Sequence, residues 1–380
     1  MDSGGLWGTG SVRSVRTLIV AAGGGGDAIT GTALARQLGL TDAPIVLTYS
    51  WDRLLIDPRP GPRNAADFTG LRALVPGLLQ VTRSTTPVPP TGSSLPRLAA
   101  DLPARVLLLD PARGATGLAE QIDAAATHFA AEDIALVDVG GDAITTGDDP
   151  GLRSPLADQL ALAACVRTAI PTQLAIAGAG LDGEIPTHVV VERLAQLDAK
   201  HLPDLTPADI APVRHVFDWH PSEASGLLAA AAAGRRGRVE VRDAGDQVEL
   251  TDATAAVLAV DATRAAEITP ARHLTETTSL ADAEQIIRDH TGLSEIEYET
   301  RKAERLDRHH VRRPTTADLA EIDRRAADAR HRGADYISTR RLSELLGATS
   351  TDTFAALTAL LAEHRPHAYE PSLYRTAPAR

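Results

Sequence analysis

The sequence has almost no cysteine and few aromatic residues, and both shortages limit what the protein can be. Cys165 is the only cysteine among 380 residues, which excludes an intramolecular disulfide and a cysteine-based metal cluster. It lies in the apolar run LALAACV, which predicts a buried core thiol and not a nucleophile. Aromatic residues make up 3% of the chain, so small and aliphatic side chains must supply the core.

Long apolar runs are absent from the sequence. No segment approaches the roughly 20 uninterrupted apolar residues that cross a bilayer, and the opening residues contain no apolar stretch of signal-peptide length. The formal net charge of −12 argues against general affinity for nucleic acid or an anionic membrane. We therefore expect a cytoplasmic protein that acts on a small molecule and binds neither membranes nor nucleic acid.

Short apolar runs alternate with helix-length segments in the first half of the chain. We expect strands at 16–22, 44–49, 105–109, 134–139 and 173–177, and helices at 28–38, 117–129 and 154–169. Continuous apolar strands separated by helices are typical of parallel sheets covered on both faces. The sequence therefore predicts an α/β fold with a Rossmann-like, doubly wound, mainly parallel sheet, which binds ligands beyond the carboxyl ends of its strands.

The pattern changes after about residue 205. We expect helices at 207–217, 222–233 and 279–292, and a short strand at 255–261. Residues 239–250 alternate around the turn DAGD, which predicts a β-hairpin. Further helices are expected at 316–330, 339–346 and 351–363. We divide the chain into a flexible N-terminus (1–15), an α/β ligand-binding domain (16–305) with the hairpin as an insertion, and a helical C-terminal module (306–380).

The C-terminal module allows two interpretations. Residues 336–347 and the helix after them have the outline of a helix-turn-helix. The module is nearly balanced in charge, however, and apolar spacing alone often produces such outlines. A helical cap on the domain, or a contact in a homo-oligomer, is the interpretation that we favour.

The first glycine-rich turn follows the first expected strand. Gly24, Gly25 and Gly26 precede a helix, where terminal N–H groups bind anions. The spacing fits a dinucleotide fingerprint, but four consecutive glycines satisfy many patterns by chance, and the next strand has no acidic residue at its tip. Asp27 would repel a pyrophosphate unless a metal ion bridged them or the carboxylate bound a hydroxyl. No lysine follows the glycines, so the Walker pattern is absent.

Two further turns combine glycine with carboxylate in the same way. Glycine lets the backbone approach a ligand, and aspartate oxygens bind cations or sugar hydroxyls. Helix capping is the simpler explanation for Asp27 or Asp142 taken singly. Because each turn ends a parallel strand, we expect the three turns to share one crevice. The residues concerned are Asp138, Gly140, Gly141 and Asp142 in the second turn and Gly180, Asp182 and Glu184 in the third.

Four other residues are candidate ligand contacts. Ser154, with Pro155 after it, begins a helix, and Asp158 lies one turn later on the same face. Arg59 and Arg63 lie in a proline-rich loop, and guanidinium groups bind phosphate or carboxylate in a bidentate manner. Surface salt bridges are the alternative role for these arginines.

One group of histidines and carboxylates lies close together in the sequence. It does not match the HExxH pattern, and we do not expect a zinc site there. The group consists of His215, Asp218, His220 and Glu223.

The motifs occur in a specific order. GGGGDAITG (23–31), WDRLLIDPRPGPR (51–63), VDVGGD (137–142), DPGLRSPLAD (149–158) and GAGLDGE (178–184) are followed by HPSEASGLLAAAAAGRRGRVEVR (220–242). This combination resembles the prokaryotic family called domain of unknown function 1152, over about residues 15–305. The resemblance implies a Rossmann-like fold in which these turns define the family, and it assigns no substrate. Residues after about 310 lie outside the resemblance.

These features predict an enzyme that acts on a nucleotide, nucleoside or sugar phosphate by metal-assisted hydrolysis or group transfer. Asp142 and Asp182 are the expected catalytic residues. Mg²⁺ or another divalent cation would bind Asp27, Asp138 and Asp142. One alternative is a metabolite-sensing module without turnover that signals through the C-terminal helices. The other is an enzyme that uses NAD or S-adenosylmethionine at the first glycine turn.

Overall fold

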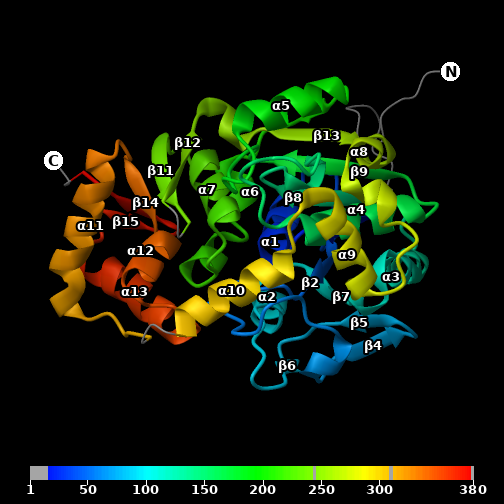
Figure 1. Cartoon of the computed structure of the whole chain (residues 1–380), viewed down its shortest axis with the longest axis horizontal. Coiled ribbons are helices and arrows are strands. Elements are labelled where there is room, and N and C mark those ends of the chain that lie inside the picture. Colours follow the sequence, from blue (N-terminus) through cyan, green and yellow to red (C-terminus); the bar gives the residue numbers. More distant parts are fainter. Residues whose placement is uncertain (1–15, 243–244, 308–310, 378–380) are drawn as a thin grey trace.

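A nine-stranded sheet forms the centre of the molecule (Figure 1). The computed structural model describes residues 16–242, 245–307 and 311–377, so the expectation for residues 1–15 lies outside the described residues. In spatial order the strands are β10 (Lys200–Leu202), β13 (Val257–Asp261), β9 (Thr172–Ala177), β8 (Asp133–Val139), β1 (Thr17–Ala21), β2 (Ile45–Tyr49), β7 (Arg105–Leu109), β5 (Leu78–Gln80) and β4 (Arg72–Val75).

The middle of this sheet is parallel. Strands β9, β8, β1, β2 and β7 run in the same direction, and antiparallel pairing joins the two short strands at each edge. The chain is therefore a mixed α/β protein with a large, mostly parallel central sheet, as the sequence predicted.

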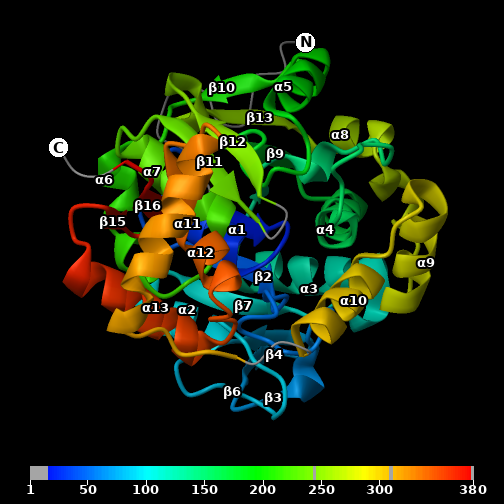
Figure 2. The ribbon, with the colours of Figure 1, turned by 60° about the vertical axis from the view of Figure 1, so that its left-hand side comes forward.

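Side-chain alternation along the strands produces a hydrophobic core on each face of the sheet. Leu18 and Val20 of β1 point to one core, and Ile19 and Ala21 point to the other. Helices cover both faces (Figure 1, Figure 2). The first face packs against α3 (Gly114–Phe129), α4 (Pro155–Arg167), α5 (Thr187–Gln196), α8 (Ala262–Ile268) and α9 (Leu280–Thr291). The second packs against α1 (Gly25–Ala33), α2 (Leu95–Asp101) and α7 (Glu223–Ala232).

Several elements differ from the sequence-based expectation. Helix α1 begins at Gly25, so part of the glycine run is helical. The helix expected at 207–217 is broken into α6 (Pro207–Ile210) and a 3₁₀ helix at Arg214–Asp218. The sequence did not predict α10 (Glu295–Asp307), which is mostly polar. It also missed α2, α5, α8 and the short strands β3 (Phe68–Thr69), β4, β5, β6 (Thr86–Pro87) and β10.

The C-terminal residues contain strands, which corrects the expectation of a purely helical module. β14 (Tyr336–Ser338), β15 (Tyr369–Glu370) and β16 (Leu373–Arg375) share a second sheet with the hairpin of β11 (Gly237–Val241) and β12 (Asp246–Leu250). Its order is β12-β11-β14-β16-β15, with β11 parallel to β14. The helix-turn-helix outline therefore begins with a strand. These strands are too short, and their partners too distant in sequence, for local patterns to reveal them.

A third hydrophobic core holds the C-terminal helices against this second sheet. It contains Ile322 of α11 (Leu319–His331), Leu342 of α12 (Thr339–Leu345), Leu357 of α13 (Thr351–His364) and Ile337 of β14. The helices lie beside the hairpin in both views (Figure 1, Figure 2).

None of the helices in the described part of the chain is long and apolar enough to span a membrane.

We expect removal of all residues after Pro314 to destabilise the whole protein. The truncation takes β14 away from β11 and removes Tyr336 and Leu373, which pack in the same core as the apolar side chains of the hairpin. The loss of this burial should lower the unfolding temperature by roughly 10 °C or more. Thermal denaturation of the soluble fraction tests this. A truncated chain that unfolds at the full-length temperature would show that residues 315–380 are a separable module.

Candidate functional site

The connections between parallel strands change direction beside β1. From β1 the chain passes to β2 and β7 on one side, and later to β8 and β9 on the other. A crevice opens at the carboxyl ends of the strands where such a reversal occurs. A cavity lies there, and residues of all three predicted turns line it.

The structure brings most of the predicted ligand-binding residues to this cavity. Those that line it are Gly24, Gly25, Gly26, Asp27, Asp142, Ser154, Asp158, Asp182 and Glu184. Those that do not line it are Asp138, Gly140, Gly141, Gly180, Arg59 and Arg63. Asp138 and the three glycines belong to the predicted turns and lie behind the residues that line the cavity. The two arginines are described below.

Three buried carboxylates lie close enough together to hold a metal ion. Asp138, Asp142 and Asp158 can each offer one oxygen, and these oxygens lie within 4.8 Å of one another. The predicted metal set contained Asp27 where this group contains Asp158. Asp27 instead accepts the backbone N–H of Gly23 at 2.6 Å, which fixes the start of the glycine turn.

The two oxygens of Asp138 are already engaged by the second turn. They accept the N–H groups of Gly141 at 3.2 Å and Ala143 at 3.0 Å. Asp138 therefore holds the turn in shape, in the way that an Asx turn does. This leaves Asp142 and Asp158 as the carboxylates of the group that face the cavity.

Asp182 has one oxygen without a partner. Its Oδ1 accepts the N–H of Glu184 at 2.8 Å, whereas its buried Oδ2 has no hydrogen bond to any described residue. A buried acceptor without a donor is costly, so this oxygen is suited to a proton, a cation or a ligand hydroxyl.

Burial raises the pKa of five aspartates at this site, which are Asp27, Asp138, Asp142, Asp158 and Asp182. Desolvation raises the pKa of Asp27 and of Asp182 to about 7. Desolvation, together with repulsion from neighbouring carboxylates, raises the pKa of Asp138, Asp142 and Asp158 well above the ordinary value. Like charges in a poorly solvated site oppose ionisation. The cluster must therefore be partly protonated or neutralised by a cation.

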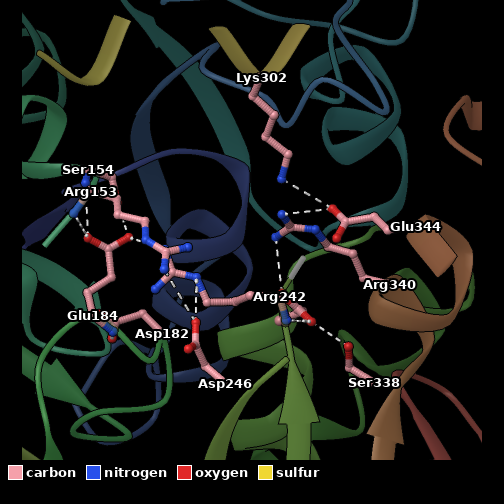
Figure 3. Close-up of polar contacts among 11 residues, drawn as sticks. Arg153, Ser154, Asp182, Glu184, Arg242, Asp246, Lys302, Ser338, Arg340 and Glu344 are labelled. Carbon is pink, nitrogen blue, oxygen red and sulfur yellow. Dashed lines mark hydrogen bonds and ion pairs between the residues drawn. The ribbon is translucent and has the colours of Figure 1, made fainter. Parts of the chain in front are cut away.

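Glu184 organises one wall of the cavity. Its Oε2 accepts the N–H groups of Arg153 at 2.7 Å and Ser154 at 2.9 Å, and its Oε1 accepts the Ser154 hydroxyl at 2.5 Å. Arg242 of the hairpin donates to Oε1 at 3.2 Å (Figure 3). Ser154 begins α4 without capping it. Through these contacts, Ser154 and Glu184 hold this wall of the cavity in position.

Helix α10 closes another side of the cavity, and the sequence analysis missed it. Glu295 accepts the N–H groups of Leu156 at 2.9 Å and Ala157 at 3.4 Å, and so caps α4. Glu299 accepts the indole N–H of Trp51 at 3.0 Å. Glu295, Glu299 and Lys302 follow one another at helical spacing, and this polar stripe is the signal that could have revealed the helix.

Arg63 does not face the cavity, which corrects the expectation that it binds substrate. Its guanidinium pairs with Asp57 at 2.9 Å and donates to the carbonyl groups of Pro60 and Gly61 at 2.6 and 2.5 Å. The folded proline loop needs a donor for these converging carbonyls, and Arg63 supplies it. Arg59 is exposed and does not line the cavity. The cations that line it are Arg53, Arg153, Arg242, Lys302 and Arg340.

The C-terminal helix α12 contributes directly to the cavity. Lys302 and Arg340 each contact Glu344 at 3.4 Å (Figure 3). Arg340 also contacts Glu223 at 3.2 Å. Truncation after Pro314 would remove Arg340 and Glu344. Loss of ligand binding in the truncated chain would therefore not distinguish an enzyme from a sensor, because the truncation removes part of the cavity lining in either case.

One family model matches most of the chain. It is described as protein of unknown function (DUF1152), and it covers residues 18–303. The chain belongs to this family. No curated protein and no solved structure matches it. All three glycine-rich turns of this DUF1152 protein lie within the matched residues, whereas Arg340 and Glu344 lie beyond them.

Gly140 in this DUF1152 protein is expected to be irreplaceable. Its φ is +125°, and a Cβ atom there would lie 2.1 Å from Oδ2 of Asp182. Gly140→Ala should therefore lower the free energy of unfolding by about 2–4 kcal/mol, as measured by urea denaturation.

Gly77→Ala is the matched control for this substitution. Gly77 also has a positive φ, of +80°, but no atom lies within 4 Å of the added Cβ. The difference between the two variants reports the contact with Asp182 together with the more strained backbone at Gly140. Equal losses in both variants would contradict the tight packing of the second turn against the third.

Proposed function

We propose that this protein is a metal-dependent enzyme that hydrolyses or transfers a group of a nucleotide, nucleoside or sugar phosphate. The observation that carries the proposal is the group of Asp138, Asp142 and Asp158, whose oxygens lie within 4.8 Å of one another at the carboxyl edge of the sheet. Carboxylate oxygens are the ligands that Mg²⁺ prefers. A divalent cation would also relieve the repulsion among these buried groups.

The surrounding residues support distinct roles in this chemistry. Asp142 and Asp158 would hold the cation, and Asp138 would support them from behind. The cation would neutralise charge on the reacting group and activate a water molecule. Asp182, with a pKa raised by burial to about 7 and an unpartnered Oδ2, is suited to accept the proton of that water. Asp27 would bind a substrate hydroxyl.

A thermal-shift screen of nucleotides, nucleosides and sugar phosphates, with and without Mg²⁺, tests this function. We expect at least one compound to raise the unfolding temperature only when Mg²⁺ is present, and to be consumed on incubation. Failure of Mg²⁺ to bind the full-length chain at pH 8 would contradict the proposal.

A second candidate rests on the order of the parallel strands. Counted along the chain, β1, β2, β7, β8 and β9 lie in the spatial order 3-2-1-4-5, which supports a Rossmann-like relationship and hence NAD or S-adenosylmethionine as ligand. Asp52, shortly after β2, accepts the N–H of Ser94 at 2.9 Å, so a ribose would have to compete for this carboxylate. Stabilisation by either cofactor without metal would favour this candidate. A role as sensor and a homo-oligomer through the C-terminal helices also stay predictions.

A further inference from the structure

The N-terminus of α1 lacks the acidic partner that the N-terminus of α4 has. Glu295 accepts the first amides of α4, but no side chain among the described residues caps α1. The N-cap residue of α1 is Gly24, which has no side chain to offer. The first amides of a helix have no acceptor within the helix, and the helix dipole makes them electropositive. The end of α1 beside the cavity is therefore suited to an anion.

Close packing around the glycines leaves the cavity as the open side of this turn. A Cβ on Gly24 would lie 2.8 Å from the carbonyl oxygen of Trp51, and one on Gly26 would lie 2.6 Å from the Ser222 hydroxyl. Both glycines line the cavity. A ligand that enters the cavity can thus approach the backbone without a side chain between them.

His220 provides an independent observation that points to a ligand. Its side chain is 6% exposed, lines the cavity, and has an Nε2 without a hydrogen bond to any described residue. Nε2 lies 3.0 Å from the position of a Cβ on Gly25, beside Leu98 and Ser94, and so adjoins the first residue of α1. Nδ1 accepts the N–H of Ser222 at 3.3 Å, which places the proton of the neutral ring on Nε2.

The protonation state of His220 agrees with a role as donor. Burial, together with the nearby charge of Arg53, lowers the pKa of His220 to about 3. The ring is therefore neutral near pH 7, and its Nε2–H is a buried donor that lacks an acceptor. Leaving such a donor unpaired is costly, and an oxygen of the ligand would remove that cost.

Arg53 adds positive charge to the same part of the cavity. It is exposed, it lines the cavity, and it lies close enough to influence both His220 and Asp27. Backbone amides, an imidazole and a guanidinium thus line the same cavity. A tetrahedral phosphate has enough oxygens to accept from all three kinds of donor.

We propose that the first turn of α1, His220 and Arg53 form a subsite for the phosphate group of the substrate. The inference rests on the proposed function, because a cation in the carboxylate cluster would screen the phosphate from Asp27 and Asp158. It adds that the substrate is phosphorylated, and that His220 binds phosphate and not metal.

Titration of the full-length protein with inorganic phosphate, with and without Mg²⁺, tests the subsite by calorimetry. His220→Phe removes the donor at similar size and should weaken phosphate binding roughly tenfold or more. His220→Gln keeps an N–H donor and should recover much of the affinity. His201→Phe, at a half-exposed histidine of β10 far from the cavity lining, is the control and should bind like the unaltered chain.

Unchanged phosphate affinity in His220→Phe would overturn the subsite, as would the absence of phosphate binding by the unaltered chain under both conditions. Nitrogen-15 NMR of the unaltered chain provides a test that needs no variant. We expect the Nε2–H tautomer, with a shift of that resonance when phosphate is added, and an Nδ1–H tautomer would overturn the assignment. Phosphate binding that depends on His220 without any binding of Mg²⁺ would support the subsite and contradict only the proposed metal chemistry.

Discussion

Asp142→Asn is expected to abolish Mg²⁺ binding and turnover while it stabilises the metal-free protein. Asp142 is buried, and three of the groups that raise its pKa are the neighbouring carboxylates Asp158, Asp138 and Asp182. Asparagine has nearly the same shape and carries no charge. The substitution therefore removes both a proposed metal ligand and a source of repulsion.

The two effects can be measured on the same variant. Calorimetric titration with Mg²⁺ should show loss of binding, and thermal denaturation at about pH 8 should show an unfolding temperature several degrees higher than that of the unaltered metal-free chain. Lost binding together with gained stability is a common trade-off, because functional sites often contain groups that destabilise the fold.

Asp148→Asn is the matched control, because Asp148 lies in the loop that follows Asp142 but is exposed. Its metal affinity and unfolding temperature should stay within error of the unaltered chain. Asp142→Asn with full Mg²⁺ affinity would remove Asp142 from the metal site. A strongly destabilised Asp142→Asn would show instead that its carboxylate supports the fold.

The parts of the site that could be predicted from the sequence are those set by strand ends. Asp27, Asp142 and Asp182 each follow a short apolar strand, and the carboxyl ends of parallel strands meet at one edge. Local pattern was sufficient because β1 and β8 are continuous buried runs of five and seven residues, and β9 is interrupted only by the partly buried Gln173. Which of the neighbouring carboxylates lie close enough together to share a metal ion was not predictable, since this depends on distances between turns.

The residues that the sequence analysis missed reach the cavity through long-range packing. Glu295 lies on a mostly polar helix with few apolar side chains, so hydrophobic content reveals it poorly. Arg340 is brought to the cavity by α12, which follows β14, and β14 is held by pairing with β11 from a distant part of the sequence. Arg53 and Arg63 belong to one loop. Only the way in which that loop folds decides that Arg53 lines the cavity and Arg63 binds carbonyl groups.

The stability of the metal-free protein is expected to fall as the pH rises from about 5 to 8. Burial raises the pKa of Asp27 and Asp182 from 3.8 to about 7, so the folded chain holds protons that the unfolded chain has already lost. The state that binds more protons, here the folded state, is favoured at low pH. The stabilisation from these groups is therefore complete below about pH 4 and is lost as the pH rises through about 7.

Asp52, whose pKa is raised by burial to about 6, adds to the decline. His220, whose pKa is lowered by burial to about 3, opposes it below about pH 6.5, because the unfolded chain binds a proton there that the folded chain does not. Ion pairs and hydrogen bonds with arginines lower the pKa of Asp149 and Glu223 despite their burial, so the stabilisation from these groups is already complete above about pH 5. Thermal denaturation without metal should show the decline between about pH 5 and 8. A rising unfolding temperature over this range would contradict the raised pKa values.

Mg²⁺ should oppose the decline, because a cation held by Asp142 and Asp158 would lessen the repulsion that acts on the neighbouring carboxylates. Its affinity is expected to rise with pH, by roughly tenfold per pH unit for each proton released, because burial and repulsion raise the pKa of Asp142 and Asp158 well above the ordinary value. Calorimetry in buffers of different ionisation enthalpy counts those protons, and the count should fall as the pH rises. Affinity that does not change between about pH 6 and 8 would mean that the cation binds outside the buried carboxylates, and that the charge repulsion within the cluster is relieved in some other way.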